Sequence, residues 1–329
     1  MNVAAMRQAG GNGLGRFVLR RIALGVLTLF LVSLLVFVAT EALPGNAARA
    51  VLGRDATPAA LHALEAKLHL DRPIWQQYGL WLGGLLQGNP GHSLVNGDPV
   101  LAQAMPRIRN SAALLVLAGL IGVPPALFAG IFAARRRDGW FDTAVSTGAL
   151  ALAAMPEFVV GMALVILLAT TVFHLLPPVS LVPPGAHVLA MPRILVLPVL
   201  TLALVIFPYI FRMMRGSMAE ILESDYIEMA RLKGIGHGRI IFLHALPNAI
   251  APVIQVIALT FAYLAGGVVL VEYVFAYPGI GQGLVQAIMS RDIPVIQFDV
   301  VVLAGFYVAL NIVADLLAAL ATPRLRAGG

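Results

Sequence analysis

Six long apolar segments constrain this chain more than any other feature of its sequence. They lie within residues 22–39, 111–134, 140–173, 193–214, 249–275 and 295–320. A helix needs about 20 predominantly apolar residues to cross the ~30 Å hydrocarbon core of a bilayer. Hydrophobic residues make up 60% of the chain and charged residues only 12%, about half of the charged share in soluble domains. We therefore predict an all-α polytopic membrane protein with six transmembrane helices.

Lysine and arginine are distributed unevenly about these predicted spans. With a cytoplasmic N-terminus, 14 of the 22 lie inside and 8 outside, and six of those 8 fall in the long segment around residues 49–109. Long translocated loops are largely exempt from the positive-inside rule, so the short loops compare as 14 against 2. The bias predicts that both termini are cytoplasmic. Residues 1–40 then hold a cytoplasmic start and the first transmembrane helix, and residues 323–329 form a cytoplasmic tail.

Residues 41–108 contain no apolar run of spanning length and are predicted to be a folded extracytoplasmic insertion. A helical pattern begins at Thr57-Pro58, and aromatic residues suited to a membrane interface follow it. These aromatic residues are Trp75, Tyr78 and Trp81. The insertion could pack over the helices or serve as a platform for a partner, and the sequence leaves both open. The remaining five spans, within residues 109–322, form the predicted membrane core.

The polar stretch at residues 217–250 separates the fourth and fifth spans. Asp225 and Glu228 have the spacing of a capping box, which predicts a short helix over residues 226–233. Gly234 is placed to end that helix in the left-handed conformation. A second short segment at residues 239–245 is predicted to end at Leu246-Pro247. A helix of about eight residues is marginal in water, so either the rest of the chain or a partner must stabilise this one.

This polar stretch carries a recognisable series of residues. Glu228-Met229-Ala230, then Gly234, then Leu246-Pro247 follow the order of the EAA loop, with Met229 in place of the first alanine. The chain thereby resembles the permease subunits of bacterial ABC importers. Four further segments resemble the dipeptide, oligopeptide and nickel branch of this family. They are FVLRRIALGVLTLFLVSLLVF, LDRPIWQQYGLWLGGLLQGNPGHS, VVLVEYVFAYPGIGQGLVQAI and RDIPVIQ. The resemblance covers nearly the whole chain.

The resemblance implies a set of partners and a location in the bacterial cytoplasmic membrane. The core would be an ABC transmembrane type-1 domain whose EAA loop, residues 215–247, docks its coupling helix on a cytoplasmic ATPase. Coupling would involve Glu228, Ala230, Gly234, Leu246 and Pro247. The expected partners are a second homologous permease, two ATPases that bind ATP and Mg²⁺, an extracytoplasmic substrate-binding protein and membrane lipid, but no nucleic acid. Relatives of this branch handle peptides, nickel chelates, glutathione and haem-like solutes.

Acidic residues within the spans are candidates for the solute path. A carboxylate at mid-membrane costs about 2.5–3.5 kcal/mol on insertion scales, so each should face a cavity or a partner. Glu157, beside Pro156, and Glu272 are the two candidates, although Glu272, like Asp315, lies near an interface where a structural role is common. Prolines within the spans favour broken helices; Pro198 and Pro208 are expected to break the fourth span.

The sequence offers no catalytic or metal-binding motif. A Walker A motif needs Gly-Lys-Ser/Thr, but Lys67 and Lys233 each follow a residue other than glycine. The chain has no cysteine, which excludes disulfides and thiolate sites. We therefore predict no catalytic residue, no metal site and no cofactor in this chain. The alternative to an ABC permease is a self-sufficient secondary transporter or channel, which would be expected to show an internal repeat.

Overall fold

The computed structural model describes residues 13–42, 57, 72–183 and 187–321. Within these ranges the chain is helical and forms no strand; His92 and Pro99 make one isolated bridge. Five helical segments are long and apolar enough to span a membrane. They comprise α1 (Gly13–Glu41), α5 (Val100–Arg135), α8 (Pro192–Leu222), α11 (Leu246–Val274), which is preceded by α10, and α13 (Ile293–Ala321). The predicted all-α polytopic fold is confirmed.

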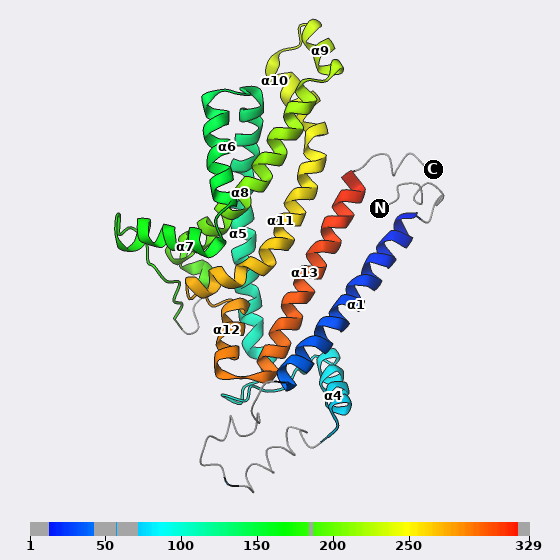
Figure 1. The fold of residues 1–329 in the computed structure, drawn as a ribbon, viewed down its shortest axis with the longest axis vertical. Coiled ribbons are helices and arrows are strands. Elements are labelled where there is room, and N and C mark those ends of the chain that lie inside the picture. The colour runs from blue at the N-terminus through cyan, green and yellow to red at the C-terminus, as the bar shows by residue number, and fades with distance from the viewer. Residues whose placement is uncertain (1–12, 43–56, 58–71, 184–186, 322–329) are drawn as a thin grey trace.

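The sixth predicted span, within residues 140–173, is sharply bent. It consists of α6 (Trp140–Ala153) and α7 (Glu157–Val165), which continues through a π-helical turn, and the two helices meet at 107°. Pro156 stands immediately before α7 and carries an extended ψ of 146°, so the helical path is interrupted there. Counting this bent pair as one span gives six. In Figure 1, α7 runs outward from the bundle instead of along it.

The expected break in the fourth span is wrong, because α8 runs without interruption through Pro198 and Pro208. Proline lacks the N–H that would bind the carbonyl four residues earlier. For Pro198 that carbonyl belongs to Ile194, and the hydroxyl of Ser180 donates a hydrogen bond to it at 2.6 Å. A side chain from the preceding loop therefore replaces the missing backbone donor, and the helix continues.

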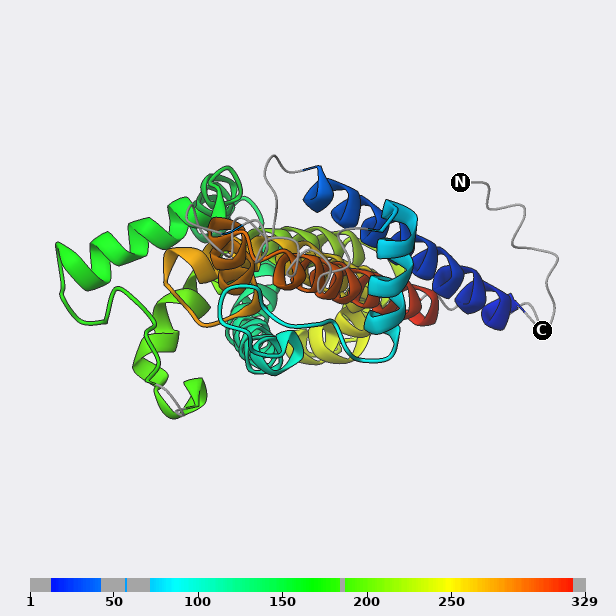
Figure 2. The same cartoon turned by 90° about the horizontal axis from the view of Figure 1, so that it is seen from below.

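The bundle is built around α8. Helices α5 and α11 pack against it, α13 packs against α11, and α1 lies outermost against α13. The large apolar side chains of α8, such as Ile206 and Phe211, are fully buried in this core. The short helices α9 (Asp225–Leu232) and α10 (His237–Arg239) lie at one end of the bundle. Helices α4 (Ile74–Leu86) and α12 (Ile280–Ser290) lie at the other end, as Figures 1 and 2 show.

The described part of the 41–108 segment packs on the membrane helices. The ring centroids of Tyr78 and Trp81 on α4 lie 5.3 Å and 5.8 Å from that of Phe37 on α1. The hydroxyls of Tyr78 and Ser33 are 2.8 Å apart. Trp75 stays exposed. Helix α5 already begins at Val100, and the helix predicted from Thr57-Pro58 falls largely outside the described residues.

Candidate functional site

Helix α9 and the turn after it form the tip of the bundle. The helix begins after Ser224, whose carbonyl oxygen accepts the N–H groups of Ile227 and Glu228 at 3.0 and 3.1 Å. The predicted capping box is wrong: Asp225 is already the first helical residue, and no side chain caps the helix. The Ser224 hydroxyl donates back to the Ile221 carbonyl instead, so it is not available to the new helix. Both acidic residues still lie at the positive end of the helix dipole.

Gly234 ends the helix as predicted, with a φ of +75°. Its N–H donates to the Arg231 carbonyl at 2.9 Å, and the Ile235 N–H donates to the Ala230 carbonyl at 3.2 Å. The chain then turns back through α10 and a π-helical segment, η4 (Ile240–Ala245). This segment ends at Ala245 and α11 begins at Leu246, as predicted, although no loop separates the two. Pro247 is tolerated because the first residues of a helix need no intrahelical donor.

The surface of α9 combines a narrow buried face with exposed apolar residues. Ile227 and Ala230 point into the core and are buried. Tyr226, Met229 and Leu232 are exposed, and Leu232 is 76% accessible. Exposed apolar groups that cluster on a projecting element commonly mark a protein-binding surface. Of the predicted coupling residues, Glu228 and Gly234 are exposed on this tip, and Ala230 is buried. Leu246 and Pro247 belong to the first turn of α11, beside Asn248, which bonds to Tyr226 of α9.

Side chains attach this tip to the spanning helices. The Arg231 guanidinium donates to the Leu222 carbonyl of α8 at 3.2 Å. The Tyr226 hydroxyl accepts a bond from the Asn248 amide of α11 at 3.2 Å. Arg137, in the turn between α5 and α6, forms an ion pair with Glu223, next to the first residues of α9. These contacts join α9 to α8 and α11, and the Arg137–Glu223 pair joins the end of α8 to the α5–α6 turn.

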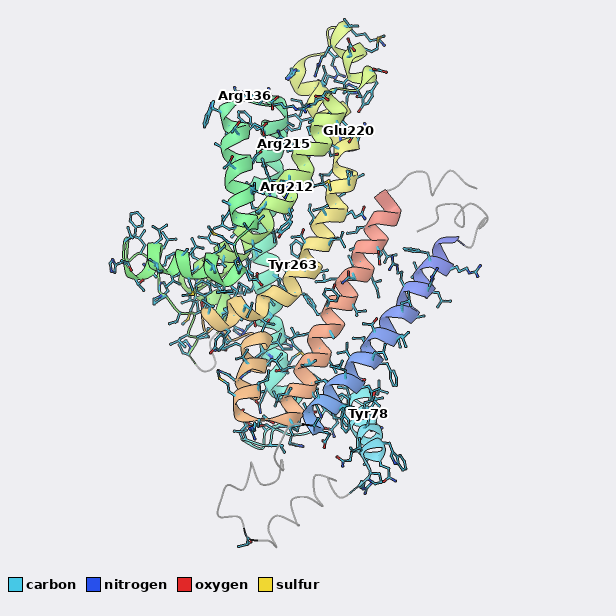
Figure 3. All side chains as sticks on the ribbon, viewed as in Figure 1. Tyr78, Arg136, Arg212, Arg215, Glu220 and Tyr263 are labelled. Carbon is cyan, nitrogen blue, oxygen red and sulfur yellow. The ribbon has the colours of Figure 1, made fainter. Side chains whose placement is uncertain are left out.

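A buried ion pair below the tip joins α6 to α8. The Arg215 guanidinium binds both carboxylate oxygens of Asp142, with NH2 to Oδ2 at 2.6 Å (Figure 3 labels Arg215). The Asp138 N–H at 3.0 Å and the Ser146 hydroxyl at 3.2 Å donate to the same carboxylate, which is buried. The sequence analysis did not single out Asp142 as a functional or structural residue. Its position as the one acidic residue in the first turn of an apolar helix could have indicated a buried partner.

The two candidate path residues have different surroundings. Glu272 is completely buried, and its carboxylate accepts the Ser111 hydroxyl and the N–H groups of Gly281, at 2.7 Å, and Gln282, at 3.3 Å. It thereby caps the N-terminus of α12 from a neighbouring helix. Glu157 is half-buried at the start of α7, against α11, where a Cβ on Gly267 would lie 2.9 Å from its Oε1. Its surroundings leave a role in the path open, whereas those of Glu272 favour a structural role.

The other acids within the spans also differ. Asp315 forms an ion pair with Arg21 of α1 at 3.0 Å. Asp299 is buried, and neither of its carboxylate oxygens has a hydrogen-bond partner among the described residues.

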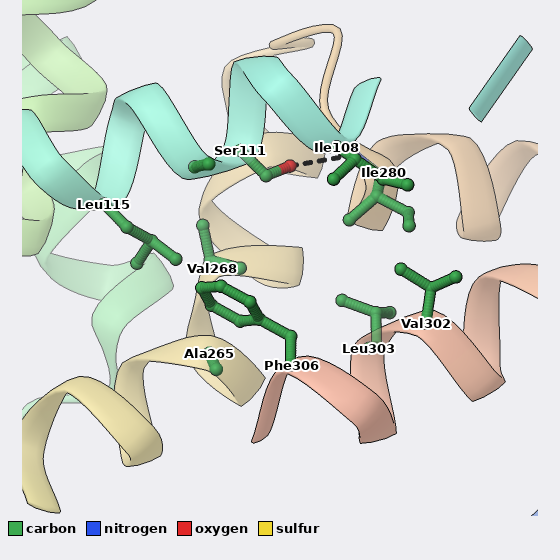
Figure 4. A pocket seen from close by; sticks show the side chains of 10 residues that line it. Ile108, Ser111, Leu115, Ala265, Val268, Ile280, Val302, Leu303 and Phe306 are labelled. Atoms are coloured by element: carbon green, nitrogen blue, oxygen red, sulfur yellow. Dashed lines mark hydrogen bonds between the residues drawn. The ribbon is translucent and has the colours of Figure 1, made fainter. Parts of the chain in front are cut away.

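A cavity of about 50 Å³ lies between α5, α11, α12 and α13 (Figure 4). Apart from Ser111, its lining is apolar and includes Leu115, Val268 and Phe306. The Ser111 hydroxyl already bonds to Glu272 and to the Ile280 N–H, so it offers little to a polar solute.

Comparison of the sequence with known proteins shows the family of this chain. A family model described as "Binding-protein-dependent transport system inner membrane component" matches residues 126–327, and the corresponding N-terminal model matches residues 14–107. The chain is 36% identical over 309 residues to a protein of Brucella abortus named as a peptide transport system permease, with 94% of this chain and 98% of the relative covered.

Alignments with two further relatives also cover 94% of this chain and 98% of each relative. The di/tripeptide transport system permease of Pseudomonas aeruginosa is 35% identical, and the dipeptide transport system permease of Escherichia coli is 32% identical. The chain therefore belongs to the binding-protein-dependent transport system inner membrane components, the permease subunits of ABC importers.

Proposed function

We propose that this permease forms half of a translocation path for peptides or similar small solutes and is driven through α9. The supporting observation is the tip itself: a short helix with exposed Tyr226, Met229 and Leu232, held by side chains to α8 and α11. An exposed apolar surface on an eight-residue helix is costly unless a partner covers it. A cytoplasmic ATPase is that partner, and its closure would move α9 together with the attached helices.

The full transporter would contain two permeases, two ATPases and an extracytoplasmic binding protein. ATP and Mg²⁺ would bind in the ATPase subunits, and their hydrolysis cycle supplies the differential free energy that shifts the permeases between inward-facing and outward-facing states. The charge bias of 14 to 2 supports a cytoplasmic α9 and cytoplasmic termini. The second permease would be homologous to this one.

Peptides are proposed as the cargo because the relatives named above are peptide, di/tripeptide and dipeptide permeases. Glu157 is the proposed path residue, because a half-buried carboxylate at the bend of the third span needs a polar surrounding. Glu157→Gln should change the transport rate or the preference between solutes while the complex still assembles. Unchanged kinetics across several peptides would make Glu157 a structural residue.

The experiment that tests the proposed function is purification of the chain from its native membranes under mild conditions. We expect a second permease and ATPase subunits to copurify with this chain. The purified complex should hydrolyse ATP, whereas the chain separated from its partners should not. Proteoliposomes that hold this chain alone give the opposite test. Solute uptake by them without ATP or partners would show a self-sufficient carrier and overturn the proposal.

A further inference from the structure

The central helix of the bundle exposes only one narrow strip of its surface. Between Ile194 and Leu222, four residues of α8 are exposed: Tyr209, Arg212, Gly216 and Glu220. Their spacings of three and four residues place them on one side of the helix. Every other residue in this part of α8 is buried or half-buried. The exposed strip contains no aliphatic side chain.

The exposed surface of α5 has the opposite character. Between residues 111 and 134 its exposed residues are all apolar: Val116, Leu120, Ile121, Pro124, Pro125 and Phe128. Such a surface suits contact with lipid chains. The strip on α8 has a different composition: within the span it exposes Tyr209, and toward α9 it continues as Arg212, Gly216 and Glu220. The two helices therefore face different surroundings in the membrane.

One polar side chain of α11, Tyr263, and one of α7, Glu157, extend the α8 strip, while Leu259, one turn before Tyr263, is also exposed. Tyr263 on α11 is exposed and lies near Glu157 and Tyr209. Glu157 also approaches Gly267, one turn beyond Tyr263 on the same helix. We call Glu157, Tyr209, Arg212, Gly216, Glu220 and Tyr263 the polar stripe. Figure 3 shows Arg212 between Tyr263 and Glu220 along the long axis of the bundle.

The stripe continues into the depth of the membrane. At a rise of 1.5 Å per residue, Arg193 and Arg212 at the two ends of the apolar part of α8 are about 28 Å apart, close to the thickness of the hydrocarbon core. Tyr209 lies inside this interval, and Tyr263 lies near both Tyr209 and Glu157. Arg212 lies at its α9 end, and Gly216 and Glu220 lie about 6 and 12 Å beyond it, outside the hydrocarbon. A polar surface at this depth requires water or another protein against it.

We propose that the polar stripe is the wall of the water-filled cargo path. The opposite wall would come from the second permease, so this inference rests on the proposed function. The stripe offers a guanidinium, two carboxylates and two phenols, which suits a hydrophilic solute that carries charges of both signs. A short peptide with free ammonium and carboxylate ends has this chemistry. Binding along the path would be weak and distributed, because the charged groups lie on successive turns of α8 and across to α7.

The chain contains no cysteine, so single introduced cysteines report local access to water. Tyr263→Cys is the main probe, because Tyr263 is exposed near Tyr209, which lies within the hydrocarbon interval. Gly216→Cys, where a Cβ meets no atom within 4 Å, marks the α9 end of the stripe outside that interval. Leu120→Cys and Phe128→Cys are controls with comparable exposure on the apolar surface of α5. Each variant is assembled with its partners in inside-out vesicles and treated with a charged, water-soluble methanethiosulfonate.

We expect the stripe cysteines to react at least ten-fold faster than the α5 controls in the assembled transporter. Replacing Arg212 by Gln beside Gly216→Cys should raise the ratio of cationic to anionic reagent rates several-fold, because the positive charge one turn away is lost. Reaction rates of the stripe cysteines equal to those of the controls would overturn the inference, as would fast reaction in the isolated chain but not in the complex. The second result would show that the other permease covers the stripe. ATP-driven uptake by the same vesicles tests the proposed function separately.

Discussion

Gly234 is the residue at which the direction of α9 is set. Its φ of +75° is costly for a residue with a Cβ, by roughly 1–2 kcal/mol. Gly234→Val should therefore re-aim or fray the helix without touching the membrane core. We expect normal insertion, loss of transport, and either weak ATPase binding or hydrolysis that no longer responds to loaded binding protein.

Gly236→Val is the matched control for this change. Gly236 has an ordinary φ of −60°, and a Cβ there meets nothing within 4 Å. Its transport should stay close to the wild-type rate. Wild-type transport and coupled hydrolysis in Gly234→Val would make the segment an ordinary surface turn and not a coupling lever.

The Asp142–Arg215 pair gives a second prediction at this scale. Lysine keeps the charge of Arg215 but cannot form the two parallel bonds to the carboxylate. We expect Arg215→Lys to lower the free energy of unfolding by about 1–3 kcal/mol. Breaking a fully buried ion pair costs ~3–5 kcal/mol. The loss should be smaller here because the Arg215 side chain is 30% exposed. Thermal inactivation measures the loss, with Arg135→Lys as the control on an exposed arginine. Equal midpoints for the two variants would contradict a role of the pair in joining α6 to α8.

Individual bonds were the hardest feature to predict. The left-handed conformation of Gly234 followed from its place after a run of helix formers. The ion-pair partner of Asp142 could not be predicted in this way, because Arg215 is 73 residues away in the sequence and only packing brings the two together. The capping box failed for a local reason, since the helix begins one residue earlier than the Asp225–Glu228 spacing implies.

At the scale of elements, the apolar runs predicted the spanning helices well and the effects of proline poorly. Proline removes one backbone donor wherever it stands, but the outcome depends on what replaces that donor. At Pro198 the Ser180 hydroxyl replaces it and α8 continues, whereas the chain bends by 107° around Pro156. The compensating group comes from a separate loop, so no local pattern could separate these two cases.

Helix α12 provides a prediction of its own. Its first N–H groups are bound by Glu272 and Ser111, which lie on α11 and α5. In Glu272→Gln the amide oxygen can still accept the two α12 N–H groups, but the amide NH2 replaces the oxygen that accepts the Ser111 hydroxyl. The buried hydroxyl then loses its acceptor, a change that costs about 1–3 kcal/mol. We expect a less stable transporter whose preference among peptides is unchanged, measured by thermal inactivation and by competition between solutes. A changed preference at wild-type stability would place Glu272 in the path instead.

For the whole molecule, the charge bias predicts which end of the bundle lies in the cytoplasm. Val95, in the loop at the α12 end, and Lys233, beside α9, are both exposed. A cysteine at position 95 should react with an impermeant thiol reagent on intact cells or spheroplasts. A cysteine at position 233 should react only after the membrane is opened. The reverse pattern would invert the topology and exclude docking of α9 on a cytoplasmic ATPase.

The central claim is that α9 contacts the ATPase that drives transport. Met229 is exposed on α9, and Leu243, on η4, is exposed outside α9 and serves as a control. A photoreactive amino acid is placed at each position in turn in the assembled transporter, and its covalent adducts are identified by mass spectrometry. The account predicts an ATPase adduct at position 229, in much higher yield than at position 243. Adducts at position 229 with lipid or with the other permease, and none with an ATPase, would contradict it.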